Sequence, residues 1–127
     1  SYIRQYTSTY LESAGVDGKF LFPDEIASRP MSSELRRNLF LVIKEALHNI
    51  VKHSGAETVN LNLRFDHNII SIEITDNGKG FIPGTKNGTG NGLINMRKRM
   101  EDIDGQFEIS SETGKGSTIK LSVSMHL

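Results

Sequence analysis

Cysteine and tryptophan are absent from this 127-residue chain, and it has only three prolines. The lack of cysteine excludes disulfides, zinc–thiolate sites and cysteine nucleophiles. The four histidines are scattered without the regular spacing of metal ligands. Because a chain of this length can bury a hydrophobic core without crosslinks, we expect one domain over residues 1–127.

Long apolar runs and an excess of one charge are also missing. No run reaches the roughly 18 apolar residues of a membrane span, and there is no signal-peptide pattern. We therefore expect a soluble, cytoplasmic segment without direct membrane contact, although it could belong to a larger membrane-anchored protein. Fifteen basic residues balance fifteen acidic ones, which argues against a nucleic-acid partner and leaves recognition of a polyanion to a local site.

Hydrophobic periodicity predicts three helices and five strands. Ser32 and Ser33 can cap the long second helix, Gly55 can follow it, and Gly105 can close the third helix. The order of elements predicts an α+β fold in which helices pack on a single face of one sheet. The helices are expected over residues 1–14, 33–54 and 93–103, and the strands over residues 18–23, 59–65, 70–76, 107–109 and 119–125.

A polar row runs along one edge of the long helix, beside its apolar stripe. At about 100° per residue, its members fall within about 40° of one another. The row contains an acid, an amide and a base, so it is either a candidate site or an ordinary solvated face with an i,i+4 pairing. Its members are Asn38, Glu45, Asn49 and Lys52, with His48 and His53 flanking them.

Asp76 is anomalous because strict alternation places it on the same side of its strand as Ile72 and Ile74. A buried carboxylate is costly without a partner. It could cap a nearby backbone, or it could await a ligand donor such as an amino group. Alternatively, Asp76-Asn77-Gly78 could form a tight hairpin turn, but the residues that follow supply no strand of adequate length.

Glycine recurs from residue 78 to residue 92, and Gly88, Gly90 and Gly92 directly precede the third helix. Free N–H groups at a helix N-terminus attract phosphate. The GTGNGL stretch does not fit a Rossmann fingerprint or a Walker loop, and the segment lacks the carboxylates of an EF-hand. It is either a phosphate-binding loop or a mobile loop without a ligand.

Ser117 shares strand parity with Ile119 and Leu121, so its hydroxyl should face the layer between the sheet and the helices. It is a candidate donor to a phosphate in that layer. The alternative is a polar residue that merely begins a strand after a glycine turn.

Four ordered motifs together resemble a known family. They are EALHNIVKH (45–53), DNGKGF (76–81), GTGNGLINMRKR (88–99) and GKGSTIKL (114–121). This pattern, over about residues 15–125, resembles the ATP-binding catalytic domain of sensor histidine kinases. That domain belongs to the superfamily shared with DNA gyrase, heat-shock chaperone ATPases and mismatch-repair ATPases. The stretch GNGLINMRKR is most similar to the nitrate-sensor branch.

The resemblance implies a Bergerat-type two-layer α/β sandwich with a mixed, mostly antiparallel sheet, and a site for ATP and Mg²⁺. Asn49 would hold Mg²⁺ through its side-chain oxygen, and Lys52 and His53 would lie near the phosphates. Glu45 stands where the superfamily has a catalytic acidic residue that orients a water or the accepting group.

The resemblance also implies how the base and the lid are arranged. Asp76 would accept a hydrogen bond from the adenine amino group, and residues 78–92, chiefly 81–91, would form the ATP lid. Further implied ATP-binding positions are Gly78 and Gly80 beside the purine, backbone at Gly90, Gly92 and Leu93 beside the phosphates, and Ser117, where the family usually has threonine.

By the same resemblance, the γ-phosphoryl group would pass to a histidine on a separate dimerisation domain of the same kinase. From there it would pass to a response regulator, with a full-length homodimer. None of His48, His53, His67 and His126 stands in the context of that acceptor histidine, so we expect the chain alone to bind nucleotide without a proper acceptor. The lid is short and lacks the aromatic motif of longer lids. An anti-sigma-type serine kinase and a non-catalytic nucleotide-sensing module remain as alternatives.

Overall fold

The computed structural model describes residues 2–23, 31–80 and 92–125. The first helix, the long helix and all five strands lie where periodicity predicted them. In chain order the elements are α1 (Tyr2–Ser13), β1 (Asp17–Leu21), α2 (Ser33–Asn49), the π-helical turn η2 (Ile50–Ser54), β2 (Thr58–Asp66), β3 (Ile69–Asp76), α3 (Gly92–Glu101), β4 (Gln106–Glu112) and β5 (Gly116–Ser124).

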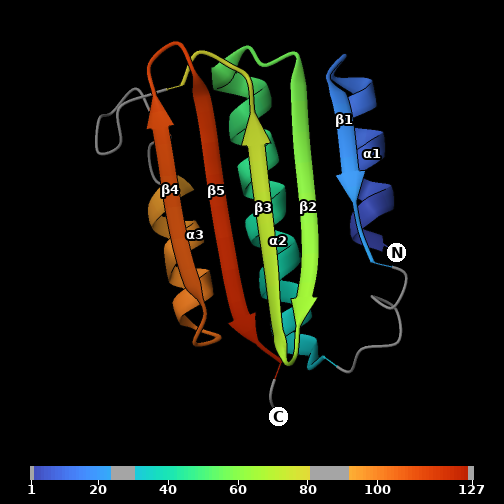
Figure 1. Ribbon diagram of the computed structural model, residues 1–127, viewed down its shortest axis with the longest axis vertical. Coiled ribbons are helices and arrows are strands. Elements are labelled where there is room, and N and C mark those ends of the chain that lie inside the picture. The colour runs from blue at the N-terminus through green and yellow to red at the C-terminus, as the bar shows by residue number, and fades with distance from the viewer. Residues whose placement is uncertain (1, 24–30, 81–91, 126–127) are drawn as a thin grey trace.

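The strands form one sheet in the order β1-β2-β3-β5-β4. Strand β1 pairs in parallel with β2, and the other neighbours pair in antiparallel fashion. The helices α1, α2 and α3 lie on the same face of this sheet, and its other face is open (Figure 1). This arrangement confirms the predicted α+β fold with a mixed, mostly antiparallel sheet.

The core fills the space between the helices and the sheet. Every residue of the predicted apolar stripe of α2 is buried: Leu35, Leu39, Ile43, Ala46 and Ile50. Alternate residues of β2, β3 and β5 meet this stripe, because side chains of a strand point to opposite faces in turn. Within the described ranges, no helix combines the length and apolar character needed to cross a membrane.

Helix α2 and the turn η2 together span the predicted long helix, from residue 33 to residue 54, but the π-helical form of the last turn was unexpected. The Ser32 side chain accepts a hydrogen bond from the Leu35 N–H at 3.1 Å, as a helix N-cap should. Past Asn49 the chain widens into η2, and Gly55 follows with a left-handed φ of 66°. Periodicity did not predict the π-helical turn, a feature often found at functional sites.

The third helix closes at Gly105 as predicted, but the left-handed residue is the one before it. Helix α3 ends at Glu101, the Gly105 N–H donates to the Met100 carbonyl at 2.7 Å, and Asp104 adopts the left-handed conformation, with φ 56°. Gly105 also packs closely, because a Cβ there would lie 3.0 Å from the Ser122 backbone oxygen. A short polar side chain at Asp104 tolerates the left-handed region well enough to end the helix.

One end of the molecule gathers the segments that the sequence singled out. Strand β3 ends there, strands β2 and β5 begin there, and α2 with η2 reaches the same end, which is the upper end in Figure 1. Asp76, Ser117 and Asn49 are thereby brought to one side of the fold.

Candidate functional site

Asp76, the last residue of β3, is only 3% exposed, as strand alternation predicted. Its Oδ1 accepts a hydrogen bond from the Gly78 N–H at 2.8 Å. Its Oδ2 accepts one from the hydroxyl of Ser117, the residue paired with it on β5. The carboxylate therefore caps a nearby backbone, one of the two roles expected. Each carboxylate oxygen has two lone pairs, so both oxygens keep acceptor capacity.

The hairpin-turn alternative at Asp76-Asn77-Gly78 is wrong for the residues that the structure describes. Residues 77–80 form no strand, and the contact from Asp76 to the Gly78 N–H is the side-chain turn typical of aspartate. The chain thus leaves the sheet directly after Asp76.

The glycines around Asp76 meet protein atoms. A Cβ at Gly78 would lie 2.6 Å from the Ser54 backbone oxygen. Gly80 and Gly116 have positive φ angles of 69° and 85°, and a Cβ would collide with the carbonyls of Glu112 and Asp76, respectively. These three glycines are thus already required by the packing of the chain on itself, a reason that the sequence did not reveal.

The polar row of α2 faces helix α3. The Asn38 Nδ2 donates to the Arg99 carbonyl at 2.9 Å. Glu45 lines a groove between the two helices together with Arg99. The alternative of an ordinary solvated face is therefore wrong for this part of the row. Lys52 and His53, further along in η2, are exposed.

Asn49 completes the row against the first residue of α3. A Cβ on Gly92 would lie 2.7 Å from the Asn49 Nδ2. This nitrogen is buried and has no hydrogen-bond partner within the described part of the chain. An unsatisfied buried polar group is costly, so the Asn49 amide is suited to a ligand rather than to the protein. Gly92 and the half-buried Leu93 form the start of α3, where backbone N–H groups lack helical acceptors.

A metal ion could be held here only with few protein ligands. The described residues contain no group of three or more His, Cys, Asp and Glu side chains able to bind a metal. Mg²⁺ usually takes one or two protein oxygens together with phosphate oxygens and water. The side-chain oxygen of Asn49, next to the start of α3, is of the ligand type that such coordination needs, whereas the unpartnered Nδ2 can only donate, as to a phosphate oxygen.

His48, which flanks the row, anchors α1. Its Nε2 lies 3.2 Å from the Tyr6 hydroxyl, and its ring stacks on that of Tyr10 at 4.7 Å. Burial, together with the neighbouring Tyr10 and Tyr2, raises the pKa of Tyr6 above its ordinary value. His48 thus contributes to helix packing.

One expected part of the site lies outside the described residues. It is the lid segment 81–91, which includes Gly90. Asn77, in contrast, lies directly beside the Asp76 carboxylate within the site, although the sequence did not single it out. Its Oδ1 accepts hydrogen bonds from the Glu57 and Thr58 N–H groups, both at 2.9 Å. Asparagine directly after a strand is a turn signal, but its partners come from another segment and could not be predicted locally.

A family model described as histidine kinase-, DNA gyrase B- and HSP90-like ATPase matches residues 34–127. Two curated proteins of Bacillus subtilis (strain 168) are similar to the chain. Sensor histidine kinase LiaS is 32% identical over 99 residues, covering 78% of the chain and 28% of that protein. Sensor histidine kinase LnrJ is 32% identical over 123 residues, covering 97% of the chain and 30% of that protein.

Solved structures share the fold at low sequence identity. The histidine kinase domain of a blue-light activated histidine kinase from Erythrobacter litoralis EL346 matches with a TM-score of 0.81 and 13% identity, over 98% of this chain and 59% of that one. The histidine kinase AdeS of Acinetobacter baumannii matches with a TM-score of 0.75 and 17% identity, over 99% of this chain and 62% of that one. The chain spans less than a third of the length of the two curated relatives.

Proposed function

The chain belongs to the family of histidine kinase-, DNA gyrase B- and HSP90-like ATPases, and on that premise we propose that it binds Mg-ATP and supplies the γ-phosphoryl group to a histidine on a separate dimerisation domain of a sensor histidine kinase. The observation that carries this proposal is the placement of two polar groups at one end of the fold. One is the buried carboxylate of Asp76, and the other is the uncommitted amide of Asn49.

The base end of the site consists of Asp76, Gly78 and Ser117. The exocyclic amino group of adenine would donate to the Asp76 carboxylate, which the Ser117 hydroxyl and the Gly78 N–H hold in place. Guanine presents a carbonyl oxygen at the same ring position, and this would face the carboxylate without a proton between them. The base end should therefore select adenine.

The phosphate end consists of Asn49 and the start of α3 at Gly92 and Leu93. The N–H groups of that first turn would bind phosphate oxygens, as helix N-termini do. Gly90 would add a backbone donor, Lys52 would add positive charge, and His53 would lie near the phosphates, since Lys52 and His53 are both exposed on η2.

Asn49 would hold Mg²⁺ through its side-chain oxygen. When bound, the ion would neutralise charge on the phosphates during transfer. The remaining work of the chain is to hold the nucleotide in line with the acceptor. Glu45, in the groove between α2 and α3, would orient the accepting group.

The two curated relatives support a histidine as the acceptor, because both are named sensor histidine kinases. The chain spans only 28% and 30% of their length, which supports an acceptor histidine on another domain. The phosphoryl group would then pass to a response regulator, and the full-length kinase would be a homodimer. We propose residues 1–127 as one ATP-binding kinase domain, with residues 78–92 as its lid.

The proposal is tested by adding Mg-ATP labelled on the γ-phosphate to the chain, together with the dimerisation domain of LiaS or LnrJ. We expect the label to appear on that domain in acid-labile form, as phosphohistidine. An acid-stable product on a protein serine would favour an anti-sigma-type kinase. Binding of ADP with no transfer to either domain would favour a nucleotide-sensing module.

A further inference from the structure

Asn77 lies at a junction of three segments directly beyond the base end. Its Oδ1 accepts hydrogen bonds from the Glu57 and Thr58 N–H groups, both at 2.9 Å. Its own N–H donates to the Thr58 carbonyl at 3.3 Å. This exposed residue is therefore fastened to the start of β2 by three hydrogen bonds, two through its side chain and one through its backbone.

The hydrogen bonds of Asn77 lie directly beyond the last paired residues of β2 and β3. Asp76 pairs with Val59, and this is the last pair between β3 and β2. Beyond it, the Asn77 side chain supplies the acceptor that a continuing strand would have supplied. The N–H groups of Glu57 and Thr58 are thereby satisfied, as backbone donors usually are in folded proteins.

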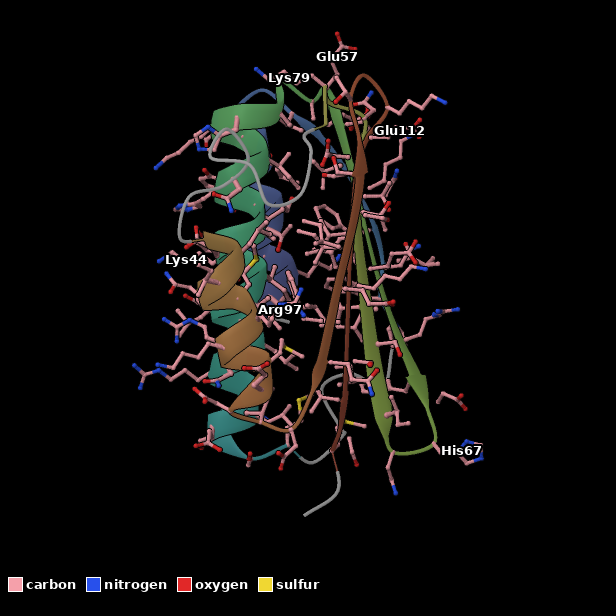
Figure 2. All side chains as sticks on the ribbon, turned by 90° about the vertical axis from the view of Figure 1, so that its left-hand side faces the viewer. Lys44, Glu57, His67, Lys79, Arg97 and Glu112 are labelled. Atoms are coloured by element: carbon pink, nitrogen blue, oxygen red, sulfur yellow. The ribbon has the colours of Figure 1, made fainter. Side chains whose placement is uncertain are left out.

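The junction extends to the end of η2 and to the β4–β5 turn. The Lys79 N–H donates to the Ser54 carbonyl at 2.9 Å, and the Gly114 N–H donates to the Lys79 carbonyl at 2.5 Å. Figure 2 shows Glu57, Lys79 and Glu112 gathered at the same end of the molecule. Asn77 therefore lies where the end of β3 meets the helix layer and the adjoining hairpin.

Asn77 is also the middle residue of the turn that holds Asp76. The Gly78 N–H donates to the Asp76 Oδ1 at 2.8 Å. The direction of that N–H is set by the peptide that joins Asn77 to Gly78. Asn77 is held through both its backbone and its side chain. It thus orients the Gly78 N–H, which holds the Asp76 carboxylate.

We propose that Asn77 is a positioning residue for base recognition, acting on Asp76 through the Gly78 N–H; this inference rests on the proposed function. Asn77 need not touch the nucleotide. Loss of its Oδ1 acceptor would remove the two hydrogen bonds that tie the side chain to Glu57 and Thr58 at the start of β2, and would free the turn to rotate. The carboxylate would then be aimed less well at an amino group, and discrimination between adenine and guanine would fall.

The test compares three variants of the chain by calorimetry with Mg-ADP and Mg-GDP, at a temperature well below each thermal midpoint. Asn77→Ala removes the acceptor. Asn77→Asp keeps an oxygen that can accept both N–H groups. Asn68→Ala is the matched control, because Asn68 is an exposed asparagine in the turn at the opposite end of the β2–β3 hairpin.

We expect Asn77→Ala to weaken ADP binding about tenfold with little change for GDP, so that base selectivity falls by the same factor, equal to about 1.4 kcal/mol. Asn77→Asp should stay within about twofold of the original chain, and Asn68→Ala should be unchanged. If Asn77→Ala fails to fold, Asn77→Ser carries the same comparison.

A lower thermal midpoint with unchanged base selectivity in Asn77→Ala would overturn the inference, since it would mark a purely structural role. Equal defects in Asn77→Ala and Asn77→Asp would also overturn it. Failure of the unaltered chain to bind ADP would be a different result, because it would remove the proposed function itself and this inference with it.

Discussion

The base end and the phosphate end of the site differ in how completely the protein satisfies their polar groups. At the base end, both oxygens of Asp76 already have donors, from Gly78 and Ser117. At the phosphate end, the Asn49 Nδ2 is buried beside Gly92 with no partner in the described residues. At the base end each carboxylate oxygen has a donor and keeps acceptor capacity, whereas at the phosphate end a buried donor has no acceptor among the described residues.

This difference is consistent with two kinds of recognition. A planar base is recognised best by a rigid acceptor, because selectivity between bases depends on the geometry of a few hydrogen bonds. Phosphates and a metal ion supply strong charges of their own, so the protein groups that meet them can be left unsatisfied until the ligand binds. Substitutions at each end should separate these two roles.

The largest expected effect is at the base end. Asp76→Asn replaces an acceptor oxygen with an amide nitrogen and removes the charge, so ADP affinity should fall about 100-fold, equal to about 2.7 kcal/mol. Calorimetry with ADP measures this. Asp66→Asn is the control, because Asp66 ends β2 at the opposite end of the same hairpin and is exposed. Unchanged ADP affinity in Asp76→Asn would refute the adenine assignment.

The second-largest loss of affinity is expected from a substitution at the phosphate end, and it should weaken only the binding of phosphate-bearing ligands. Asn49→Asp places a charge beside the phosphates, so the affinity for Mg-ATP should fall about 30-fold, while that for adenosine stays within about twofold. Calorimetry with both ligands checks this split, and Asn60→Asp, at an exposed position of β2 between the buried Val59 and Leu61, controls for the added charge. Equal losses for adenosine and Mg-ATP would contradict the metal role.

The smallest effect should come from Ser117. Ser117→Ala removes one donor from the Asp76 carboxylate, so ADP affinity should fall about fivefold, and the free energy of unfolding should fall by about 1 kcal/mol. Ser117→Thr keeps the hydroxyl and should match the original chain in both measurements. If Ser117→Thr lost as much ADP affinity as Ser117→Ala, the hydroxyl would not be the group that supports ADP binding.

Much of the fold could be predicted because its signals are local. The apolar stripe from Leu35 to Ile50 and the alternation that ends in Asp76 follow from helix and strand geometry alone. The cap at Ser32 and the left-handed Gly55 are likewise properties of short stretches. Asp104 was missed as the left-handed residue at the end of α3 because glycine, present here at the next position, usually adopts that conformation.

The site was predicted less completely, because its contacts join distant segments. Asp76 and Ser117 are 41 residues apart and meet only through the register of β3 and β5. Asn38 was correctly placed in the polar row, but its partner is a carbonyl of α3. Gly78 and Gly80 were assigned to purine contact, whereas the structure places Ser54 and Glu112 against them.

The sequence by itself therefore determined the elements, the buried face of each, and the position of a carboxylate on one of those faces, since each depends on backbone periodicity. Only the tertiary structure decided which donors satisfy Asp76, which amide nitrogen is left without an acceptor, and that Asn77 fastens the turn that follows Asp76. The physical reason is that hydrogen bonds act over about 3 Å, and sheet register and helix packing bring these distant segments within that distance.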